Sequence, residues 1–310
     1  MKLFLTPIFC LAAIALCGNP VKVGFYNVEN LYDTIPSLFH DDSDYTPSGR
    51  YRWGGERYGR KLDNLAKVID DMDMDLLAIA EVESEDAVRD LVARLGTDYN
   101  YIHRNTSDSR GLDVALLYKG DKFIPSKVRQ INLGSSRQAL YVPGKLMGQR
   151  VDLIICHLPS RFNSKAYHKN ALRKLYDFAD SLHRWDASSR IVVTGDMNCT
   201  PGERVMREVF GGSAPMEYSF FFSPFTDVEA KGYGSYAYGS RWLFYDYMLL
   251  DRAFAQGPVK YLSCGVFIKD YLLVREEGLR RGYPLRTFSG GKYTGGFSDH
   301  LPVYIILDVP

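Results

Sequence analysis

Short apolar runs that end on a polar, chemically reactive side chain recur along this sequence, and they constrain its fold more than any other feature. Each run has the length and composition of a buried strand. The runs cover residues 21–26, 75–80, 113–118, 151–156, 190–194, 244–250 and 301–307. Between them, apolar residues at helical spacing predict amphipathic helices over residues 56–72, 84–95 and 163–185. The alternation of strands and helices favours an α/β fold.

Four early strands are followed by a polar group at their carboxyl ends, and the last two strands begin near polar groups. In chain order these groups are Asn27, Glu81, His157, Asp196, Asp246 and the pair Asp299 and His300. If the last two strands run antiparallel to the others, all these side chains meet at one edge. Helix-separated strands followed by antiparallel ones predict two packed mixed β-sheets flanked by helices. We expect one domain over residues 19–310, because no long linker or internal repeat interrupts it.

The residues expected at this edge, with Glu29 and Asn198 added, have the chemistry of a hard metal site. Carboxylates and amides without thiolates suit Mg²⁺, Mn²⁺ or Ca²⁺, and such an ion neutralises phosphate oxygens. Asp196 and Asn198 are two residues apart on an extended segment, so both side chains can face the same side. The first suits a water-activating base and the second a group that holds phosphate. We also expect Asp113 to orient His157, as carboxylates often do for imidazoles.

Six short segments carry a resemblance to a known family. They read FYNVENLYD, LLAIAEVE, ICHLPSR, VVTGDMNCTP, FYDYMLLD and GFSDHLPV, and they span nearly the whole chain after its first residues. In this order they resemble the endonuclease/exonuclease/phosphatase superfamily, whose fold is the four-layer sandwich of DNase I. The variants NVENLYD and HLPSR are most similar to an exported bacterial branch of it. The resemblance implies a metal-dependent hydrolase of phosphate esters.

The resemblance also implies which residues hold the metal. Glu81 matches the principal metal-binding carboxylate, and Asn27 matches a ligand or water-holding residue beside it. Asp299 matches a late carboxylate that can join the metal, and Glu29 stands where some relatives have an Asp. For Glu29, a surface salt bridge is an equally good interpretation. The implied ion is Mg²⁺, with Mn²⁺ or Ca²⁺ as alternatives.

Five further residues match catalytic positions of the family. Asp196 matches the aspartate that activates water, and Asn198 matches its phosphate-orienting neighbour. His300 matches the histidine that stabilises the transition state, and Asp246 matches the carboxylate that orients it. His157 matches a second active-site histidine.

The charge balance bears on the substrate. Lys and Arg number 38 against 37 Asp and Glu, which gives a net charge of +1. A protein that coats nucleic acid is usually far more basic, so phosphate recognition must be local here. The phosphate ester can belong to a nucleic acid, a phospholipid headgroup, or a sugar or inositol phosphate, and no protein partner is inferred. The competing hypothesis is a non-catalytic protein that binds a phosphate ligand on the same fold.

The first residues, MKLFLTPIFCLAAIALCGNP, have one Lys and a long apolar run that ends in small residues. This pattern is typical of a secretory signal peptide and is too short for a confident membrane span. We therefore expect residues 1–18 to be a signal peptide and the protein to be periplasmic, on the cell surface or secreted, with no transmembrane span in the mature chain. A lipoprotein signal ending at Cys17 is a weaker alternative, because Leu16 stands where a small residue is usual.

Basic and aromatic residues alternate in the segment from 50 to 61. The basic ones are Arg50, Arg52, Arg57, Arg60 and Lys61, and the aromatic ones are Tyr51, Trp53 and Tyr58. They could bind a polyphosphate or a nucleic acid strand. A solvated loop and helix start is the favoured interpretation. Three single arginines, Arg110, Arg137 and Arg161, stand near the predicted site segments and could either contact phosphate or be surface charges.

Overall fold

The computed structural model describes residues 18–186, 188–211, 220–239, 241–276, 278 and 280–310. The predicted signal peptide, residues 1–18, lies outside the described residues except for its last position. No helix within these ranges is both long and apolar enough to cross a lipid bilayer.

The first sheet is built around the long amino-terminal strand. Its strand order is β14 (Lys260–Val266), β17 (Val303–Val309), β1 (Asn19–Leu31), β2 (Leu76–Val82), β4 (Asp113–Tyr118) and β3 (Asn100–His103). β1 pairs antiparallel with β17 and parallel with β2, so the sheet is mixed. Alternate residues of β1 face opposite sides: Val21 and Phe25 pack in the core between the sheets, and Tyr26 packs beneath the helices.

The second sheet is also mixed. Its strand order is β10 (Phe221–Phe222), β13 (Asp246–Asp251), β9 (Ile191–Asp196), β8 (Gln149–His157), β7 (Ala139–Leu146) and β5 (Phe123–Pro125), with β6 (Arg129–Ile131) also paired to β7. β8 and β9 are parallel, and their register places His157 beside Asp196. β13 is antiparallel to β9, and Asp246 lies opposite Asp196.

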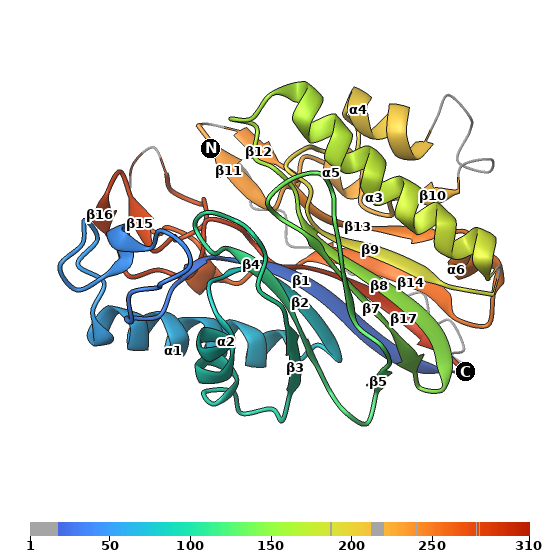
Figure 1. The fold of residues 1–310 in the computed structure, drawn as a ribbon, viewed down its shortest axis with the longest axis horizontal. Helices are drawn as coiled ribbons and strands as arrows, with labels where there is room; N and C mark the ends of the chain where they lie inside the picture. Colours follow the sequence, from blue (N-terminus) through green and yellow to red (C-terminus); the bar gives the residue numbers. More distant parts are fainter. Residues whose placement is uncertain (1–17, 187, 212–219, 240, 277, 279) are drawn as a thin grey trace, which may run out of the picture.

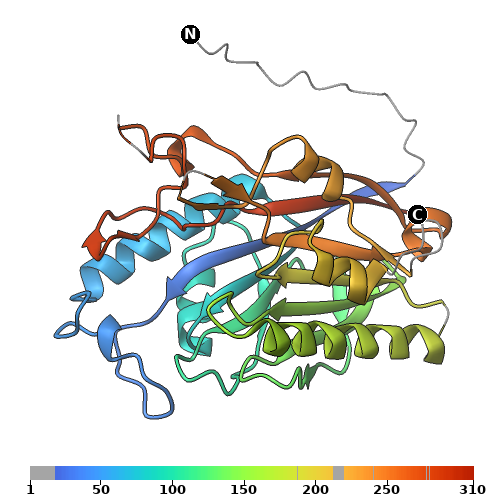
Figure 2. The same ribbon diagram turned by 90° about the horizontal axis from the view of Figure 1, so that it is seen from above.

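Helices cover the outer face of each sheet (Figures 1 and 2). α1 (Gly55–Met72) and α2 (Glu85–Val92) pack on the first sheet through a stripe that includes Leu62, Leu65 and Ile69. α3 (Lys165–Trp185) packs on the second sheet through Leu172 and Leu175. The helix–sheet–sheet–helix order confirms the predicted four-layer α/β sandwich.

Polar side chains fix where two of these helices begin. The Ser84 hydroxyl accepts a hydrogen bond from the amide of Ala87 at the start of α2. The Ser164 hydroxyl accepts one from Tyr167 at the start of α3. Each hydroxyl satisfies a backbone amide that has no partner within the first helical turn, and this fixes the residue at which the helix begins. Both helices begin within two residues of their predicted starts.

The remaining elements are short and lie mostly in the connections. They are η1 (Ser43–Tyr45), α4 (Arg204–Met206), η2 (Arg207–Gly211), α5 (Thr226–Ala230), β11 (Tyr236–Tyr238), β12 (Arg241–Leu243), α6 (Ala253–Gln256), η4 (Asp270–Leu272), β15 (Phe288–Ser289) and β16 (Lys292–Tyr293). β11 pairs with β12, and β15 pairs with β16, as two small antiparallel ribbons.

Two findings differ from the sequence analysis. The short strands β3, β5, β6 and β10 were not predicted, and neither were the longer strands β7 and β14. Pro143 and Gly144 interrupt the apolar pattern of β7, and small or polar residues such as Ser263 interrupt that of β14. The interpretation of residues 50–61 as a solvated loop and helix start was wrong for Trp53 and for Lys61, the last residue of the segment. Trp53 is fully buried, and the Lys61 side chain extends from α1 into the interior with 1% of its surface exposed.

Candidate active site

The two sheets end at a common edge, and the nine residues predicted for the site lie on segments that form it. Asn27 and Glu29 belong to β1, Glu81 to β2, His157 to β8, Asp196 to β9 and Asp246 to β13, with Asn198, Asp299 and His300 in adjoining loops. Because β13 and β17 run antiparallel to their neighbours, the amino ends of these late strands reach the edge where the early strands finish. This is the arrangement predicted from the positions of the polar groups.

Three site residues have a left-handed backbone. The φ angles of Glu29, Glu81 and Asn198 are 53°, 68° and 51°. Such values are uncommon outside glycine and cost on the order of 1–3 kcal/mol, which the surrounding structure must offset. Beside Glu81, the pairing of β1 with β2 shifts register. The amide of Asn30 also donates to Glu81 Oε2 over 2.9 Å, which fixes the carboxylate at the edge.

Asn27 joins the two sheets at the centre of the site. Its Nδ2 donates to Glu81 Oε1 over 3.3 Å and to Asp196 Oδ2 over 3.2 Å. Its Oδ1 accepts a hydrogen bond from the amide of Glu29 over 3.0 Å. In this arrangement the amide nitrogen of Asn27, rather than its oxygen, faces the carboxylates. Asn27 thus holds two carboxylates together, and its predicted role as a metal ligand stays a prediction.

Asp246 and His300 form a close hydrogen-bonded pair at the site. His300 Nδ1 donates to Asp246 Oδ2 over 2.6 Å, and Asp246 is completely buried. Burial lowers the pKa of His300, but the Asp246 carboxylate outweighs it and holds that pKa well above the usual value. His300 is therefore a cation near neutral pH. Its other nitrogen, Nε2, lies 3.9 Å from Asp196 Oδ2 and 3.9 Å from Asp299 Oδ1.

Asp196 has the electrostatics of a base for neutral solution. Burial, with the nearby charge of Asp246, raises the pKa of its carboxyl group to about 7. The amide of Asn198 donates to Asp196 Oδ1 over 2.9 Å, which leaves Oδ2 directed toward Asn27. Asn198 itself is tied down, because its Nδ2 donates to the carbonyl of Leu158 over 3.0 Å.

His157 lies against the same carboxylates but is held by an arginine. Its Nε2 is 3.7 Å from both Glu81 Oε1 and Asp196 Oδ2 and accepts a hydrogen bond from Arg137 Nη1 over 2.7 Å. Burial, together with the charge of Arg137, lowers the pKa of His157 well below its usual value. Arg137 is in turn held by Asp108 over 3.0 Å. His157 is therefore neutral in this arrangement.

The expected contact between Asp113 and His157 was wrong. Asp113 Oδ2 lies 3.2 Å from His103 Nε2, and its Oδ1 accepts hydrogen bonds from Thr106. Side chains alternate along β4, and this alternation directs Asp113 toward β3 and its loop. For Arg137, the sequence left two interpretations open, a contact to phosphate or a surface charge. In the structure, Arg137 occupies the position beside His157.

Glu29 forms hydrogen bonds and a salt bridge with the segment that precedes Asp299. Arg286 Nε donates to Glu29 Oε1 over 3.1 Å, and the amide of Thr287 donates to Glu29 Oε2 over 2.6 Å. Arg286 Nη2 also donates to Asp299 Oδ2 over 2.6 Å. Burial, with the nearby charge of Asp299, raises the pKa of Glu29 to about 7. Glu29 thus makes a buried rather than a surface salt bridge, and its predicted role as a metal ligand stays a prediction.

Lys61 extends this network from α1. Its Nζ donates to Thr287 Oγ1 over 2.7 Å and to the carbonyl of Phe297 over 2.5 Å. Burial lowers the pKa of Lys61 to about 8, although the charges of Glu29 and Asp299 act in the opposite direction. In the sequence, Lys61 stands out only as part of a basic segment, and Arg286 was not predicted as a site residue. Neither residue lies in one of the six resembling segments.

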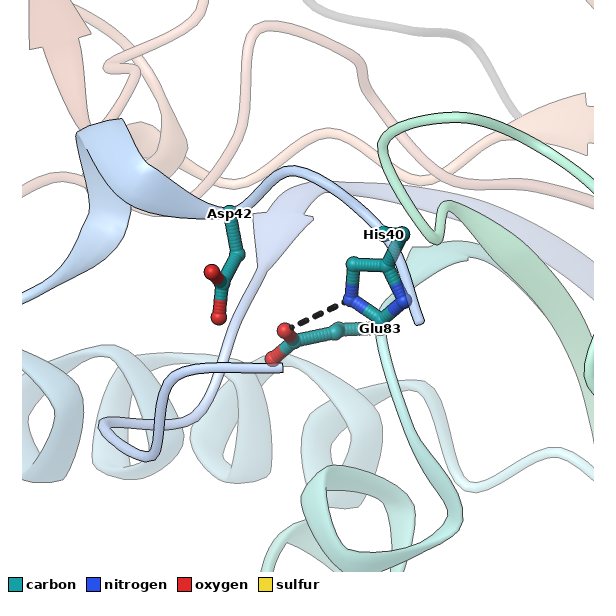
Figure 3. A group of neighbouring side chains, drawn as sticks. All are labelled: His40, Asp42 and Glu83. Atoms are coloured by element: carbon teal, nitrogen blue, oxygen red, sulfur yellow. Dashed lines mark hydrogen bonds and ion pairs between the residues drawn. The ribbon is translucent and has the colours of Figure 1, made fainter. Parts of the chain in front are cut away.

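A separate polar group lies beside the site, where the loop after β1 meets the end of β2 (Figure 3). His40 Nε2 and Glu83 Oε1 are 2.9 Å apart, and Asp42 lies beside them. The amide of Asp33 donates to Glu83 Oε2 over 2.8 Å, and the amide of Ser37 donates to Asp42 Oδ2 over 2.8 Å. These bonds hold the loop against β2.

The oxygen atoms at the centre of the site fit a hard divalent cation. The carboxylates of Glu81 and Asp196 meet at the Asn27 amide. Asp299 Oδ1 lies 3.9 Å from His300 Nε2, which is also close to Asp196. Burial and neighbouring carboxylates make the negative charge of Asp196 costly, and a bound cation would remove that cost. Asp299 still has Oδ1 directed toward His300, since Arg286 contacts Oδ2. The donor set is the one that Mg²⁺ and Mn²⁺ prefer.

A family model described as the endonuclease/exonuclease/phosphatase family matches residues 22–309. The chain belongs to this family. The match spans both sheets and every segment of the site, so membership rests on the whole fold and not on one motif. None of the curated protein sequences compared with this chain matches it.

Solved structures of other family members and related enzymes share the fold at low sequence identity. A family protein from Bacteroides thetaiotaomicron aligns with a TM-score of 0.62 and 16% identity over 94% of this chain and 98% of that one. A mannosyl-6-phosphatase from the same species aligns with a TM-score of 0.60 and 16% identity over 93% and 99%. D. rerio TDP2 in complex with a single-strand DNA product aligns with a TM-score of 0.61 and 14% identity over 94% and 99%.

Proposed function

We propose that this protein hydrolyses a phosphodiester or phosphomonoester with an activated water molecule and a divalent cation. One observation carries the proposal. A buried carboxylate with a pKa of about 7, Asp196, lies 3.9 Å from a histidine that Asp246 keeps cationic. A base beside a cation is the arrangement needed to deprotonate water and to stabilise the charge that develops on phosphate.

Each residue of the site has its own role in the proposed hydrolysis. Asp196 Oδ2 takes the proton of the attacking water, because the amide of Asn198 occupies Oδ1 and Oδ2 faces the Asn27 amide beside Glu81. His300 holds the developing charge through Nε2, since Nδ1 is occupied by Asp246. Asn27 keeps Glu81 and Asp196 at a fixed separation, and Asn198 orients the phosphate beside them.

Glu81 and Asp299 would hold the metal, with Asn27 beside them and Glu29 behind Asp299. When bound, the cation neutralises phosphate oxygens and stabilises charge on the attacking and leaving oxygens. Mg²⁺ is our first choice and Mn²⁺ or Ca²⁺ the alternatives, because all the candidate ligand atoms are oxygens.

We expect water, rather than the thiol of Cys199 or Cys156, to be the nucleophile. Burial raises the pKa of Cys199, the cysteine next to Asn198, to about 12, and the Cys156 thiol is fully buried. A cysteine attacks as the thiolate, which neither residue forms at neutral pH. Hydrolysis should then proceed without a covalent intermediate and with inversion at phosphorus.

The proposal leaves the class of phosphate ester open. The structural neighbours include a mannosyl-6-phosphatase and TDP2 with a DNA product, so both a sugar phosphate and a nucleic acid strand are supported. A phospholipid headgroup is the third candidate. The non-catalytic alternative would keep the fold without the acid–base pair, yet Asp196, Asp246 and His300 are all in place.

Hydrolysis of bis-para-nitrophenyl phosphate and para-nitrophenyl phosphate tests the proposal. We expect turnover in Mg²⁺ or Mn²⁺ and its loss in EDTA, reversed by added metal. No turnover of either ester, or of DNA, RNA, sphingomyelin, phosphoinositides and sugar phosphates, in any of these metals would favour the binding-only alternative.

We also propose that the protein is exported and that cleavage removes residues 1–18, with lipidation at Cys17 as the minor alternative. Support comes from the sequence of this segment alone. Amino-terminal sequencing of protein from the envelope or medium of the native host should find a shortened chain. An intact Met1 there would contradict the proposal.

A further inference from the structure

A cavity opens beside the active site and is lined by the segment that leads to Asp299. Its volume is about 340 Å³, and the described residues that line it lie between Val274 and Thr294 in the sequence. Arg286 lines this cavity and at the same time donates to Asp299 Oδ2 over 2.6 Å. The cavity therefore begins one side chain away from the candidate metal-binding carboxylates.

The lining of the cavity is basic. Arg280, Arg286 and Lys292 line it, against one carboxylate, Glu276. The charge of Arg286 is already shared with Glu29 and Asp299, but Arg280 and Lys292 are exposed. Among the described residues we find no ion pair to either of them. Two cations without an acidic partner are thus directed to a cavity next to a site for phosphate esters.

The basic segment at the start of α1 reaches the same wall. β16, which contains Lys292 and Tyr293, lies beside the amino-terminal end of α1 (Figure 1). The Arg57 guanidinium lies 4.4 Å from the centre of the Tyr293 ring. Arg60 approaches Gly295, and with Arg57 it influences the pKa of Tyr293. The part of the 50–61 segment that stays on the surface therefore adds positive charge to this side of the cavity.

We propose that this cavity binds a second phosphate group of the substrate while the first lies at Asp196 and His300. The inference rests on the proposed function and narrows it to phosphate esters that carry a further anionic group. Arg280 and Lys292 contact the second phosphate, and Arg286 separates it from the carboxylates of the reaction centre. Two sources share this chemistry: a nucleic acid strand, whose next phosphate follows along the backbone, and a small bisphosphate.

Two chromogenic esters that differ by one phosphate test the inference. Thymidine 5′-(para-nitrophenyl phosphate) has one phosphate, and its 3′-phosphorylated form has two. We expect kcat/KM for the second to be higher by about three- to tenfold at low salt, the range that one or two exposed charge contacts provide. The double variant Arg280→Gln/Lys292→Gln should abolish the difference and leave turnover of bis-para-nitrophenyl phosphate unchanged.

A matched control is available on α3, which covers the other sheet. Arg173 and Lys174 are also exposed there, so Arg173→Gln/Lys174→Gln removes the same two charges elsewhere and should keep the full preference. Inhibition by pyrophosphate and by a short thymidine oligonucleotide distinguishes the two sources. The double variant should weaken inhibition by the compound that resembles the natural substrate.

The inference is overturned if the 3′-phosphate gives no advantage, or if the advantage survives in Arg280→Gln/Lys292→Gln. Failure of the proposed function would look different, because the wild-type protein would then hydrolyse none of these esters, bis-para-nitrophenyl phosphate included.

Discussion

At the scale of single residues, the site is an arrangement of charges that restrain one another. Asp246 is buried and keeps His300 cationic, Arg137 keeps His157 neutral, and Asn27 holds two carboxylates together. Burial raises the pKa of the Asp196 carboxyl group to about 7, so this side chain can both bind and release a proton near neutral pH. A base that must bind and release a proton needs that freedom.

Replacing Glu81 with Gln should abolish metal-stimulated hydrolysis without unfolding the protein. The change keeps the shape of the side chain and its hydrogen bond with Asn30 but removes the charge that binds the cation. Activity as a function of Mg²⁺ concentration and thermal unfolding measure the two effects. Glu85→Gln, an exposed change at the start of α2, is the control. Near-full activity of Glu81→Gln at low metal concentration would exclude Glu81 as the principal ligand.

Replacing Asp246 with Asn should lower kcat by roughly tenfold or more while KM changes little, because a positioned cation acts mainly in the transition state. Asp246 raises the pKa of His300, so the variant loses the cationic imidazole at a lower pH than the wild type does. The decline of activity toward alkaline pH should therefore begin earlier in the variant. Equal pH profiles for the two proteins would argue against this role of the pair.

At the scale of elements, the strands position some residues of the site and the connecting segments position the others. The strands place Asn27, Glu81 and Asp196 at one edge, but Asp299 is set by the segment that carries Arg286. Lys61 ties that segment to α1 through Thr287 and Phe297.

Replacing Lys61 with Met should therefore act both on stability and on the site. The variant leaves the Thr287 hydroxyl and the Phe297 carbonyl without their donor, at a cost of about 1–3 kcal/mol each in a buried position. Denaturant unfolding and the metal concentration for half-maximal activity should both shift, the second because Asp299 loses its support. Lys67→Met is the control, since Lys67 lies exposed on the same helix and pairs only with surface groups. A variant as stable and as active as Lys67→Met would show that Lys61 has no such role.

The sequence predicted the elements that carry strong local patterns and missed those whose role depends on distant contacts. Polar groups at the ends of the predicted strands, such as Asp196 and the SDH segment, identified the edge that the two sheets share. The direction of each strand is enough to determine which strand ends meet at that edge. Arg286 could not be predicted, since its partner Glu29 is 257 residues away. For His157, the sequence suggested Asp113 as the partner and gave Arg137 no such role. The side-chain alternation of β4 and the pairing of β7 with β8 place Arg137 there instead.

At the scale of the whole molecule, the reaction centre exists only where the two sheets pack together. The hydrogen bond from Asn27 to Asp196 joins residues 169 positions apart, one from each sheet. The apolar core between the sheets, which includes Val21 and Phe25, therefore sets the geometry of the site as well as the stability of the fold.

The most direct test of the account is the turnover of Asp196→Asn with saturating Mg²⁺, measured beside Mg²⁺ binding by calorimetry. The variant keeps the size of the side chain but cannot accept the proton of the attacking water. The account predicts that kcat on bis-para-nitrophenyl phosphate, or on the best phosphate ester found, falls by about 10²–10⁴-fold while metal still binds. Turnover within a few-fold of the wild type would contradict it, because Asp196 would then not be the base that activates water.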